Sequence, residues 1–419
     1  MVEVRQSIPV EDAITRIMGK VRVGTIEKVS LIEAHGRYLA EDLIADHDVP
    51  LFDRSIVDGF AICAEDTGRA NADFPVELKM IDAIGAGYVA KEQVKPGLAI
   101  RIMTGAPIPE GANAVIMLEH VHEKEHAGNS IIEINSSVQV GANLAKQGED
   151  MKKGTILVPA GRKIAAGEMA LLATFGYDQV NVYKQPVVGI LATGSELVDV
   201  AEPLSPGKIR NSNSYMLQSQ ILQLGGIPRY LGILSDDLEE SFHAVHSALR
   251  EIDYIITTGG VSVGDYDFIP AILERLGADV LFNKVEMRPG SVTTVAHMND
   301  KWIFGLSGNP SACYVGFELF VRPILKTYLG STTPHLYKAR ALLTTDIGNP
   351  NSYARFIRAK VTTDLAECFV APVGIEKSGI VSSLAEANAL LVVPPKTKAL
   401  KKGENVEVIC FQTIEGFFE

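Results

Sequence analysis

Residues that can do chemistry follow four short apolar segments between residues 186 and 310. Each segment resembles a buried strand, and small, hydroxyl-bearing or charged side chains come directly after it. These residues are Thr193, Gly194, Ser195 and Glu196; then Thr257, Thr258, Gly259, Gly260, Ser262, Gly264, Asp265 and Asp267; then Lys284, Arg288 and Gly290; and finally Ser307, Gly308, Asn309 and Pro310. Glycine lets backbone N–H groups approach an anion, and a helix beginning at Asn309-Pro310 directs further N–H groups toward it. The pattern predicts a site for a phosphate-bearing ligand.

One pair of glycines proves little, because Gly259-Gly260 alone is equally typical of a tight turn. The prediction depends on repetition along one sheet. The carboxyl ends of parallel strands meet at one edge, and ligands of open α/β sheets bind outside that edge. We therefore expect all four groups of residues to gather there.

Acids at a phosphate site need a reason, because like charges about 4 Å apart cost roughly 4 kcal/mol at an effective dielectric near 20. A divalent cation reverses the sign of this interaction. Mg²⁺ is usually held by one or two carboxylates together with substrate phosphate oxygens. Glu196 and one of Asp265 and Asp267 fit that role. The alternative is that these acids are solvated loop residues.

Lys284 and Arg288 lie four residues apart in a segment that we interpret as a strand followed by a loop. Even spacing on a strand places two side chains on the same face. Two cations on one face predict a site for a second anion. A solvated pair is the alternative.

The elements that must position these residues alternate between strand-like and helix-like segments from 186 to 330, which favours a doubly wound, mainly parallel sheet. Short β-prone pieces fill 46–142 and 331–419, and the latter predicts a small barrel or sandwich. Helical spacing in 1–45, continuing through "LIEAHGRYLAEDL", and mixed signals in 143–185 suggest a discontinuous linker domain. We expect a multidomain α/β protein with two β-rich domains and a mixed helical linker domain.

Composition limits the partners. The chain has 419 residues and a formal net charge of −12, which disfavours non-specific binding to nucleic acid because that needs a basic surface. Its four cysteines are widely spaced, as expected of thiols in a reducing compartment. No apolar segment resembles a signal peptide or reaches membrane-spanning length. We expect a cytoplasmic protein that binds neither nucleic acid nor membrane.

The segment "EHVHEKEHAGN" carries His120, His122 and His126. Three histidines raise the possibility of a metal site, but no cysteine or fixed carboxylate accompanies them. We favour a solvated hairpin with its turn at Gly128-Asn129.

Six motifs, taken together, resemble a known family. They are "VDGFAI", "RIMTGAPIPEGANAVIM", "ATGSEL", "GKIRNSNS", "TTGGVSVGDYDF" and "GLSGNPSAC". In this order they resemble the molybdopterin molybdenumtransferases of the MoeA type, related to the C-terminal domain of gephyrin. The resemblance implies an elongated four-domain subunit that dimerises through the linker region. It also implies the last step of molybdenum cofactor synthesis, in which molybdate is inserted into adenylylated molybdopterin, AMP is released and Mg²⁺ is required.

The resemblance assigns roles that composition alone does not, since the turns at Asp58, Thr104 and Asp150 are otherwise unremarkable. It implies a site shared between the α/β domain of one subunit and the second domain of the other. The implied catalytic residues are Asp58, Thr104, Asp150, Lys284 and Arg288; the metal ligands are Glu196 and Asp267; and Arg358 with Ser382 or Ser383 lies near the molybdate. Two departures stand out: Ser307 replaces a proline found in many members, and Arg288 a lysine found in some.

Two other functions remain as alternatives. The adenylyltransferase that supplies adenylylated molybdopterin, a pathway partner of the family, shares the Gly-Gly loop but not the four-zone length. A scaffold that binds peptides through its last domain, as gephyrin does, would bind ligand without releasing AMP.

Overall fold

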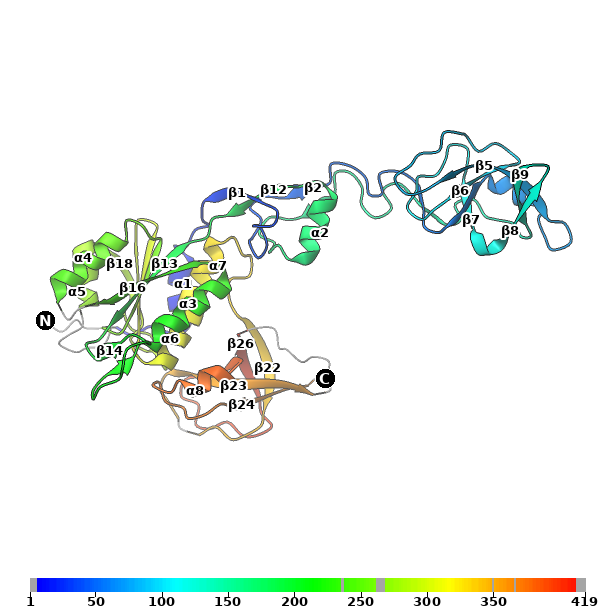
Figure 1. Ribbon diagram of the computed structural model, residues 1–419. Helices are drawn as coiled ribbons and strands as arrows, with labels where there is room; N and C mark the ends of the chain where they lie inside the picture. Colours follow the sequence, from blue (N-terminus) through cyan, green and yellow to red (C-terminus); the bar gives the residue numbers. More distant parts are fainter. Residues whose placement is uncertain (1–5, 235–236, 261–267, 349, 365–366, 412–419) are drawn as a thin grey trace. The chain divides into compact units, whose positions relative to one another are not determined.

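A computed structural model describes residues 6–234, 237–260, 268–348, 350–364 and 367–411. The chain forms two compact units (Figure 1). The first comprises residues 1–41, 160–169 and 179–419, and the second comprises 42–159 and 170–178. Within the described residues, no helix is both long and apolar enough to cross a membrane. The predicted division into four domains stays a prediction.

The larger unit contains a six-stranded sheet in the order β16-β13-β17-β21-β20-β18. The first four strands pair in parallel, while β20 pairs antiparallel with both β21 and β18. The strands are β13 (Val187–Thr193), β16 (Ile227–Leu234), β17 (Tyr254–Thr258), β18 (Asp279–Phe282), β20 (Thr294–Met298) and β21 (Lys301–Leu306). The mainly parallel sheet is thus confirmed.

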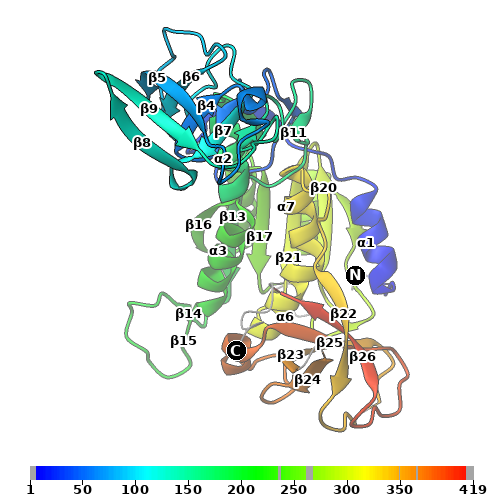
Figure 2. The ribbon, with the colours of Figure 1, turned by 90° about the vertical axis from the view of Figure 1, so that its right-hand side faces the viewer.

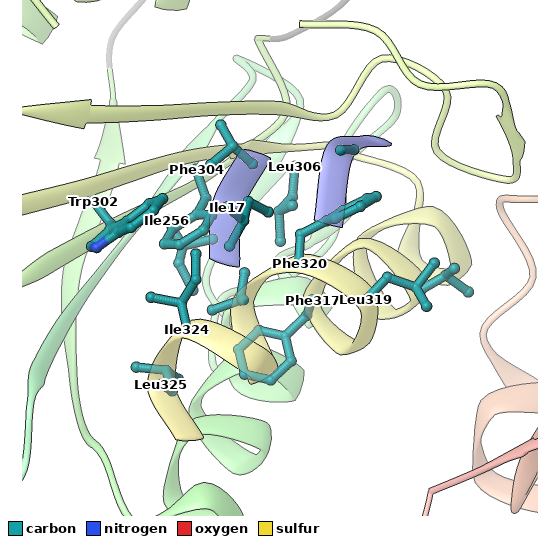
Figure 3. Close-up of a cluster of buried hydrophobic side chains, with 14 of the residues drawn as sticks. Ile17, Ile256, Trp302, Phe304, Leu306, Phe317, Leu319, Phe320, Ile324 and Leu325 are labelled. Atoms are coloured by element: carbon teal, nitrogen blue, oxygen red, sulfur yellow. The ribbon is translucent and has the colours of Figure 1, made fainter. Parts of the chain in front are cut away.

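Helices cover both faces of this sheet. Side chains alternate along a strand, so Ile256 and Phe304 pack with α1, α3 and α7, whereas Ile255 and Ile303 pack with α4 and α5. Figure 3 shows Ile256 and Phe304 beside Ile17 of α1 and Ile324 of α7. The helices are α1 (Val10–Met18), α3 (Ser212–Leu224), α4 (Leu238–Ala248), α5 (Ile269–Leu276), α6 (Pro310–Gly316) and α7 (Arg322–Tyr328), with a π-helical turn at Phe317–Val321 between the last two. This arrangement is doubly wound, as predicted.

Local sequence explains where α3 begins and ends. The Asn211 side chain accepts a hydrogen bond from the Ser214 N–H at 3.2 Å and so caps the first turn. Gly225 ends the helix in the left-handed conformation, with φ 93°, which other residues rarely adopt. This cap fixes the position of Asn211, Ser212 and Asn213, the three residues that follow β15 (Ile209–Arg210).

The C-terminal strands close into a barrel, which is one of the two folds, barrel or sandwich, that the sequence predicted for this region. The ring runs β23-β24-β22-β26-β25 and closes because β25 also pairs with β23 (Figure 2). A short strand, β19 (Met287–Arg288), adds to β23 in parallel. The ring strands are β22 (Tyr337–Leu343), β23 (Ala354–Asp364), β24 (Glu367–Pro372), β25 (Ala389–Val393) and β26 (Asn405–Cys410), and α8 (Ser382–Glu386) precedes β25.

The predicted helix in "LIEAHGRYLAEDL" is wrong. Residues 31–36 form turns, and Gly36 has φ 77°, which ends any helix there. Beyond it, Leu39 forms a bridge with Val182, next to the antiparallel pair β1 (Ile26–Ser30) and β12 (Gln179–Tyr183). Buried Arg37 pairs with Glu27 and donates to the Tyr183 carbonyl. Tertiary pairing has overridden the helical spacing.

The smaller unit holds a second six-stranded sheet in the order β7-β4-β6-β5-β9-β8. All its pairs are antiparallel except β5 with β6. Its strands are β4 (Gly59–Ile62), β5 (Val76–Ile84), β6 (Leu98–Ile102), β7 (Ala114–Met117), β8 (Val121–His126) and β9 (Asn129–Ile134). The same unit contains two short antiparallel pairs, β2 (Leu43–Ile44) with β11 (Ile156–Val158) and β3 (Arg54–Ser55) with β10 (Leu144–Ala145). The remaining helix, α2 (Ala166–Thr174), spans the boundary of the two units.

The histidine-bearing segment forms a hairpin, as predicted, but its turn is at Ala127-Gly128 and not at Gly128-Asn129, because Asn129 already begins β9. His126 faces Asn129 across a turn in which Ala127 and Gly128 both have positive φ. Strand β8 is exposed along most of its length, and no group of three metal-binding side chains occurs among the described residues.

Gly59 provides a direct test of packing in the smaller unit. A Cβ added there would lie 1.9 Å from the Ile116 carbonyl oxygen on the neighbouring strand β7. We expect Gly59→Ala to lower the free energy of unfolding by about 2 kcal/mol or more, because the backbone oxygen cannot move without breaking the β4–β7 pair. Denaturant titration measures this loss.

The matched control is Gly85→Ala, whose added Cβ has its nearest neighbour at 4.0 Å. Its effect should stay below about 1 kcal/mol. Equal losses in the two variants would refute the steric explanation.

Candidate active site

Parallel pairing brings three strand ends together at the carboxyl edge of the sheet. Ala192 faces Thr258, and Thr258 faces Leu306. Hydrogen bonds extend the alignment past the strands: the Thr193 hydroxyl donates to the Thr258 carbonyl at 3.1 Å, and the Gly259 N–H donates to the Leu306 carbonyl at 2.9 Å. The described residues that follow β13, β17 and β21 therefore meet at this edge, as predicted.

Gly259 is required by this junction. Its φ is 88°, and an added Cβ would lie 2.6 Å from the Thr193 hydroxyl and 2.7 Å from the Thr193 carbonyl oxygen. Gly308 approaches from the other side, since a Cβ there would lie 3.5 Å from the Gly259 Cα. Three backbones thus meet without side chains between them, which leaves their outer surface open to a ligand. The continuation of this loop, which includes the predicted residues Ser262, Gly264, Asp265 and Asp267, lies outside the described residues.

A pocket of about 320 Å³ opens at this junction, and we call it the strand-end pocket. It contains the predicted residues Thr193, Glu196, Gly308, Asn309 and Pro310. Its lining is completed by Leu197, Ile209, Arg210, Asn211, Ser212, Asn213, Thr258, Gly379 and Val381. The lining therefore combines hydroxyl and amide groups with one acid, Glu196, and one base, Arg210.

The first residues of α3 form a wall of this pocket that the sequence analysis missed. The Asn213 side chain donates to the Gly308 carbonyl at 2.9 Å, while its own Oδ1 is buried and has no partner among the described residues. The signal was present in "NSNS", where two asparagines and two serines precede an apolar helix. Such a run indicates a capped helix start, which is a polar surface suited to a ligand.

Glu196 is the one acid of the strand-end pocket within the described part of the chain. Its carboxylate lies against Gly194, where an added Cβ would come within 2.5 Å of Oε2. Ser195 is exposed beside it, and its carbonyl accepts a hydrogen bond from Lys208. The Glu196 carboxylate is exposed and shares the pocket lining with hydroxyl and amide side chains, which are oxygen donors of the kind that Mg²⁺ prefers.

A second pocket, of about 410 Å³, is strongly basic, and we call it the basic pocket. It shares Asn309 with the strand-end pocket. Four cationic side chains and one acid line it among the described residues: Arg288, Arg355, Arg358, Lys377 and Glu376. Its remaining lining is Pro289, Gly290, Ser291, Val292, Ser307, Asn309, Ala312, Asn351, Phe356 and Ser378. A formal excess of three positive charges favours an anion here.

The pairing of β19 with β23 places Arg288 directly opposite Arg355. Like charges opposite each other on neighbouring strands are destabilising. Glu376 relieves part of this repulsion by a bidentate pair with Arg355, at 2.8 and 2.6 Å. Arg288 is exposed and stands over the Tyr353 ring, 6.0 Å from its centroid. Its charge is therefore available to a ligand.

Arg358 is buried and held from three sides. It donates to the Ser383 hydroxyl at 2.6 Å and to the carbonyls of Ile375 and Lys377 at 2.9 and 3.3 Å. Burial lowers the pKa of this guanidinium, which remains charged at neutral pH. Ser383 thus serves to hold Arg358.

The other predicted residues of this region take different places. Ser382 begins α8 and is exposed, and neither it nor Ser383 lines the basic pocket, whereas Ser378 does. Lys284 lies between β18 and β19 and lines neither pocket, so the shared strand face expected for Lys284 and Arg288 is wrong. The sequence analysis missed Arg355 and Ser378. The segment "YARFIRAK" contains Arg355 and Arg358, and only the pairing register of β23 with β19 shows that Arg355 lies opposite Arg288.

In the smaller unit, Asp58 and Thr104 are brought together. One oxygen of the Asp58 carboxylate accepts hydrogen bonds from the Thr104 N–H at 2.7 Å and the Thr104 hydroxyl at 2.9 Å. These bonds lower the pKa of Asp58 below its usual range. Asp150 is also exposed, and its N–H donates to the Val49 carbonyl.

Comparison with known proteins gives this geometry a context. Three family descriptions match in order: "MoeA N-terminal region (domain I and II)" over residues 8–176, "Probable molybdopterin binding domain" over 189–327, and "MoeA C-terminal region (domain IV)" over 340–411. A Bacillus subtilis protein named molybdopterin molybdenumtransferase is 52% identical over 416 residues, which cover 99% of this chain and 97% of that protein. The chain belongs to the MoeA family.

Other MoeA relatives agree over the same length. A Staphylococcus epidermidis protein of the same name is 45% identical over 97% of this chain and 96% of its own. The crystal structure of a molybdopterin biosynthesis MoeA protein from Pyrococcus horikosii matches with a TM-score of 0.85 and 32% identity, covering 98% of this chain and all of that one. The multidomain α/β fold is therefore that of MoeA proteins.

The Asp58–Thr104 contact can be tested by titration. Thr104→Val removes the hydroxyl donor but keeps the backbone N–H, so the pKa of Asp58 should rise toward its usual value without fully reaching it. Because the folded pKa is depressed, this contact stabilises the protein above the unfolded pKa, and the gain is lost as pH falls through the folded pKa. NMR titration of the Asp58 carboxyl carbon measures the pKa.

Thr104→Ser keeps both donors and should leave the pKa of Asp58 unchanged. An unchanged pKa in Thr104→Val would show that the hydroxyl contributes nothing.

Proposed function

We propose that this chain inserts molybdate into adenylylated molybdopterin and releases AMP, using the strand-end and basic pockets together. As a MoeA-family enzyme it acts in molybdenum cofactor biosynthesis, the activity that the names of its relatives describe. The observation that carries the finer proposal is that a phosphate-type site and an oxyanion site adjoin through Asn309. A substrate carrying both a phosphoanhydride and a metal acceptor needs that pair of sites.

The strand-end pocket suits the phosphates of the substrate. Gly259 and Gly308 leave the backbone open, and Asn213 and Thr193 fix its shape through bonds to Gly308 and Thr258. Glu196, together with Asp267 or Asp265, would hold Mg²⁺, which when bound neutralises charge on the phosphate oxygens. Attack of water on the phosphoanhydride then releases AMP.

The basic pocket suits molybdate, a tetrahedral dianion. Arg288 and Arg358 supply positive charge and donors, and Ser378 and Ser307 line the same space. Arg288 in place of lysine keeps the charge while presenting a planar fork. Lys284 retains the role implied by the family resemblance as a prediction.

Three residues of the smaller unit complete the proposed site. Asp58, Thr104 and Asp150 would act from a second copy of the chain in a homodimer, with Asp58 orienting water or the metal. We also propose that the chain works in the cytoplasm and receives its substrate from a molybdopterin adenylyltransferase.

The activity test uses purified protein with adenylylated molybdopterin, molybdate and Mg²⁺. We expect AMP release, and a fall of about 100-fold in Glu196→Gln, because this variant loses a charge that acts on the reacting phosphate. Glu202→Gln is the control and should keep full activity, because Glu202 is an exposed acid a few residues along the chain that lines neither pocket. ATP-dependent adenylylation of molybdopterin instead, or peptide binding without AMP release, would overturn the proposal.

Molybdate affinity tests the second pocket. Arg288→Ala should weaken molybdate binding about tenfold, or 1.4 kcal/mol, through loss of one charge-assisted contact. Isothermal titration calorimetry without molybdopterin measures it. Arg340→Ala, which removes an exposed arginine elsewhere on the barrel, should bind normally; an equal loss in both variants would indicate general charge attraction.

A further inference from the structure

One loop of the barrel contributes to both pockets. It comprises residues 374–381, between β24 and α8, and we call it the crossing loop. Residues 376–378 line the basic pocket, whereas Gly379 and Val381 line the strand-end pocket. The loop therefore passes from one pocket to the other between residues 378 and 379.

Ser311 attaches the crossing loop to α6, the helix that lies beside the barrel (Figure 2). Its N–H donates to the Ser378 carbonyl at 3.0 Å, and its hydroxyl donates to the Ile380 carbonyl at 2.8 Å. The two accepting residues stand on either side of Gly379, where the loop changes pockets. Within the described residues, both hydrogen bonds that join this loop to α6 come from Ser311.

The position of Ser311 in α6 explains why it bonds outward. It is the second residue of the helix, where a backbone N–H has no partner in its own helix. Its side chain is 0% exposed, so the hydroxyl bonds to the loop away from water. In the described part of the chain, this is also the one hydrogen bond that the Ile380 carbonyl accepts. Losing it therefore disfavours the docked loop.

On the barrel side, two arginines of β23 hold a different part of the crossing loop. Arg358 donates to two carbonyls of residues 375–377, and Arg355 pairs with the Glu376 carboxylate. All these contacts come before the loop changes pockets. They fix the part in the basic pocket, and the contacts of Ser311 fix the passage into the strand-end pocket.

We propose that Ser311 is a positioning residue for both ligands of the site, because the loop that it docks on α6 forms a wall for each of them. The identity of the two ligands, the nucleotide phosphate and the oxyanion, rests on the proposed function. Ser311 lines neither pocket, so it acts through the crossing loop. Releasing the loop changes both walls at once. By thermodynamic linkage, a ligand that binds the docked loop more tightly also favours docking.

Ser311→Ala tests this role, because it removes the hydroxyl and keeps the backbone N–H. We expect the Kd of AMP and the Kd of molybdate, each measured alone by isothermal titration calorimetry, to rise about fivefold, the loss typical of one hydrogen bond. A rise for one ligand only, or for neither, would overturn the proposal.

Thr67→Val is the matched control. Thr67 is also 0% exposed, and its hydroxyl donates to the Ala64 carbonyl at the same 2.8 Å, in the smaller unit. Both variants should melt at a lower temperature, but only Ser311→Ala should raise the KM values for molybdate and adenylylated molybdopterin. A purely structural residue lowers the folded fraction, and so the apparent kcat, without changing KM. Equal changes of KM in the two variants would refute the positioning role.

Hydrogen exchange tests docking in the wild-type chain, so the test does not depend on the folding of a variant. Saturating molybdate and saturating AMP should each slow exchange of the Ser311 N–H about threefold or more, because each ligand favours the docked loop. The Gly225 N–H at the end of α3 is the control and should not change. An unchanged rate at Ser311 with either ligand would contradict the proposal.

AMP release from adenylylated molybdopterin by the wild-type chain separates this proposal from the proposed function. Release by the wild type, with unchanged Kd values in Ser311→Ala, would refute only the positioning role. Weaker binding of both ligands in Ser311→Ala, without release by the wild type, would refute only the transfer activity.

Discussion

The close approach of three backbones at Thr193, Gly259 and Gly308 is the constraint on which the site depends. It requires the parallel register of β13, β17 and β21, because a shift of one residue would move Thr258 away from both neighbours. It also requires glycine, because a Cβ at Gly259 overlaps the Thr193 backbone. The sheet therefore builds a surface of main-chain atoms at its edge, and the capped start of α3 encloses it.

Charge is distributed unevenly along this edge. The strand-end pocket holds Glu196 and Arg210, whose formal charges cancel, whereas the basic pocket holds Arg288, Arg355, Arg358 and Lys377 against Glu376. Glu376, which pairs with Arg355, is the one acid of the basic pocket among the described residues, so its four cations face the cavity with an incomplete set of counterions. Such an arrangement is unfavourable for folding, and proteins retain it where a ligand supplies the missing charge.

Much of this fold was predictable from the sequence. Alternating strands and helices from 186 onward predicted the doubly wound sheet, and the residues after β13, β17 and β21 met at one edge because parallel topology leaves no other arrangement. Leu39 shows the limit: helical spacing favoured a helix, but a bridge to Val182 prevailed. Even spacing predicted that Lys284 and Arg288 share a strand face, but β19 is only two residues long and does not include Lys284. Arg355 was missed because its place opposite Arg288 depends on the pairing of β19 with β23, which lie far apart in the sequence. Ser378 was missed because it lies outside every strand and is positioned by a hydrogen bond from the Ser311 N–H to its carbonyl.

The pairing of Arg288 with Arg355 has a mechanical consequence. Arg288 lies between the sheet strands β18 and β20, and Arg355 lies near the start of the barrel strand β23, so the β19–β23 pair holds the two charges opposite each other. An oxyanion that contacts both would act as a latch between sheet and barrel. By thermodynamic linkage, if the bound anion stabilises the β19–β23 pair by a given factor, loosening that pair lowers the anion affinity by the same factor. Anion affinity and the stability of the β19–β23 pair are then two measurements of a single coupling free energy.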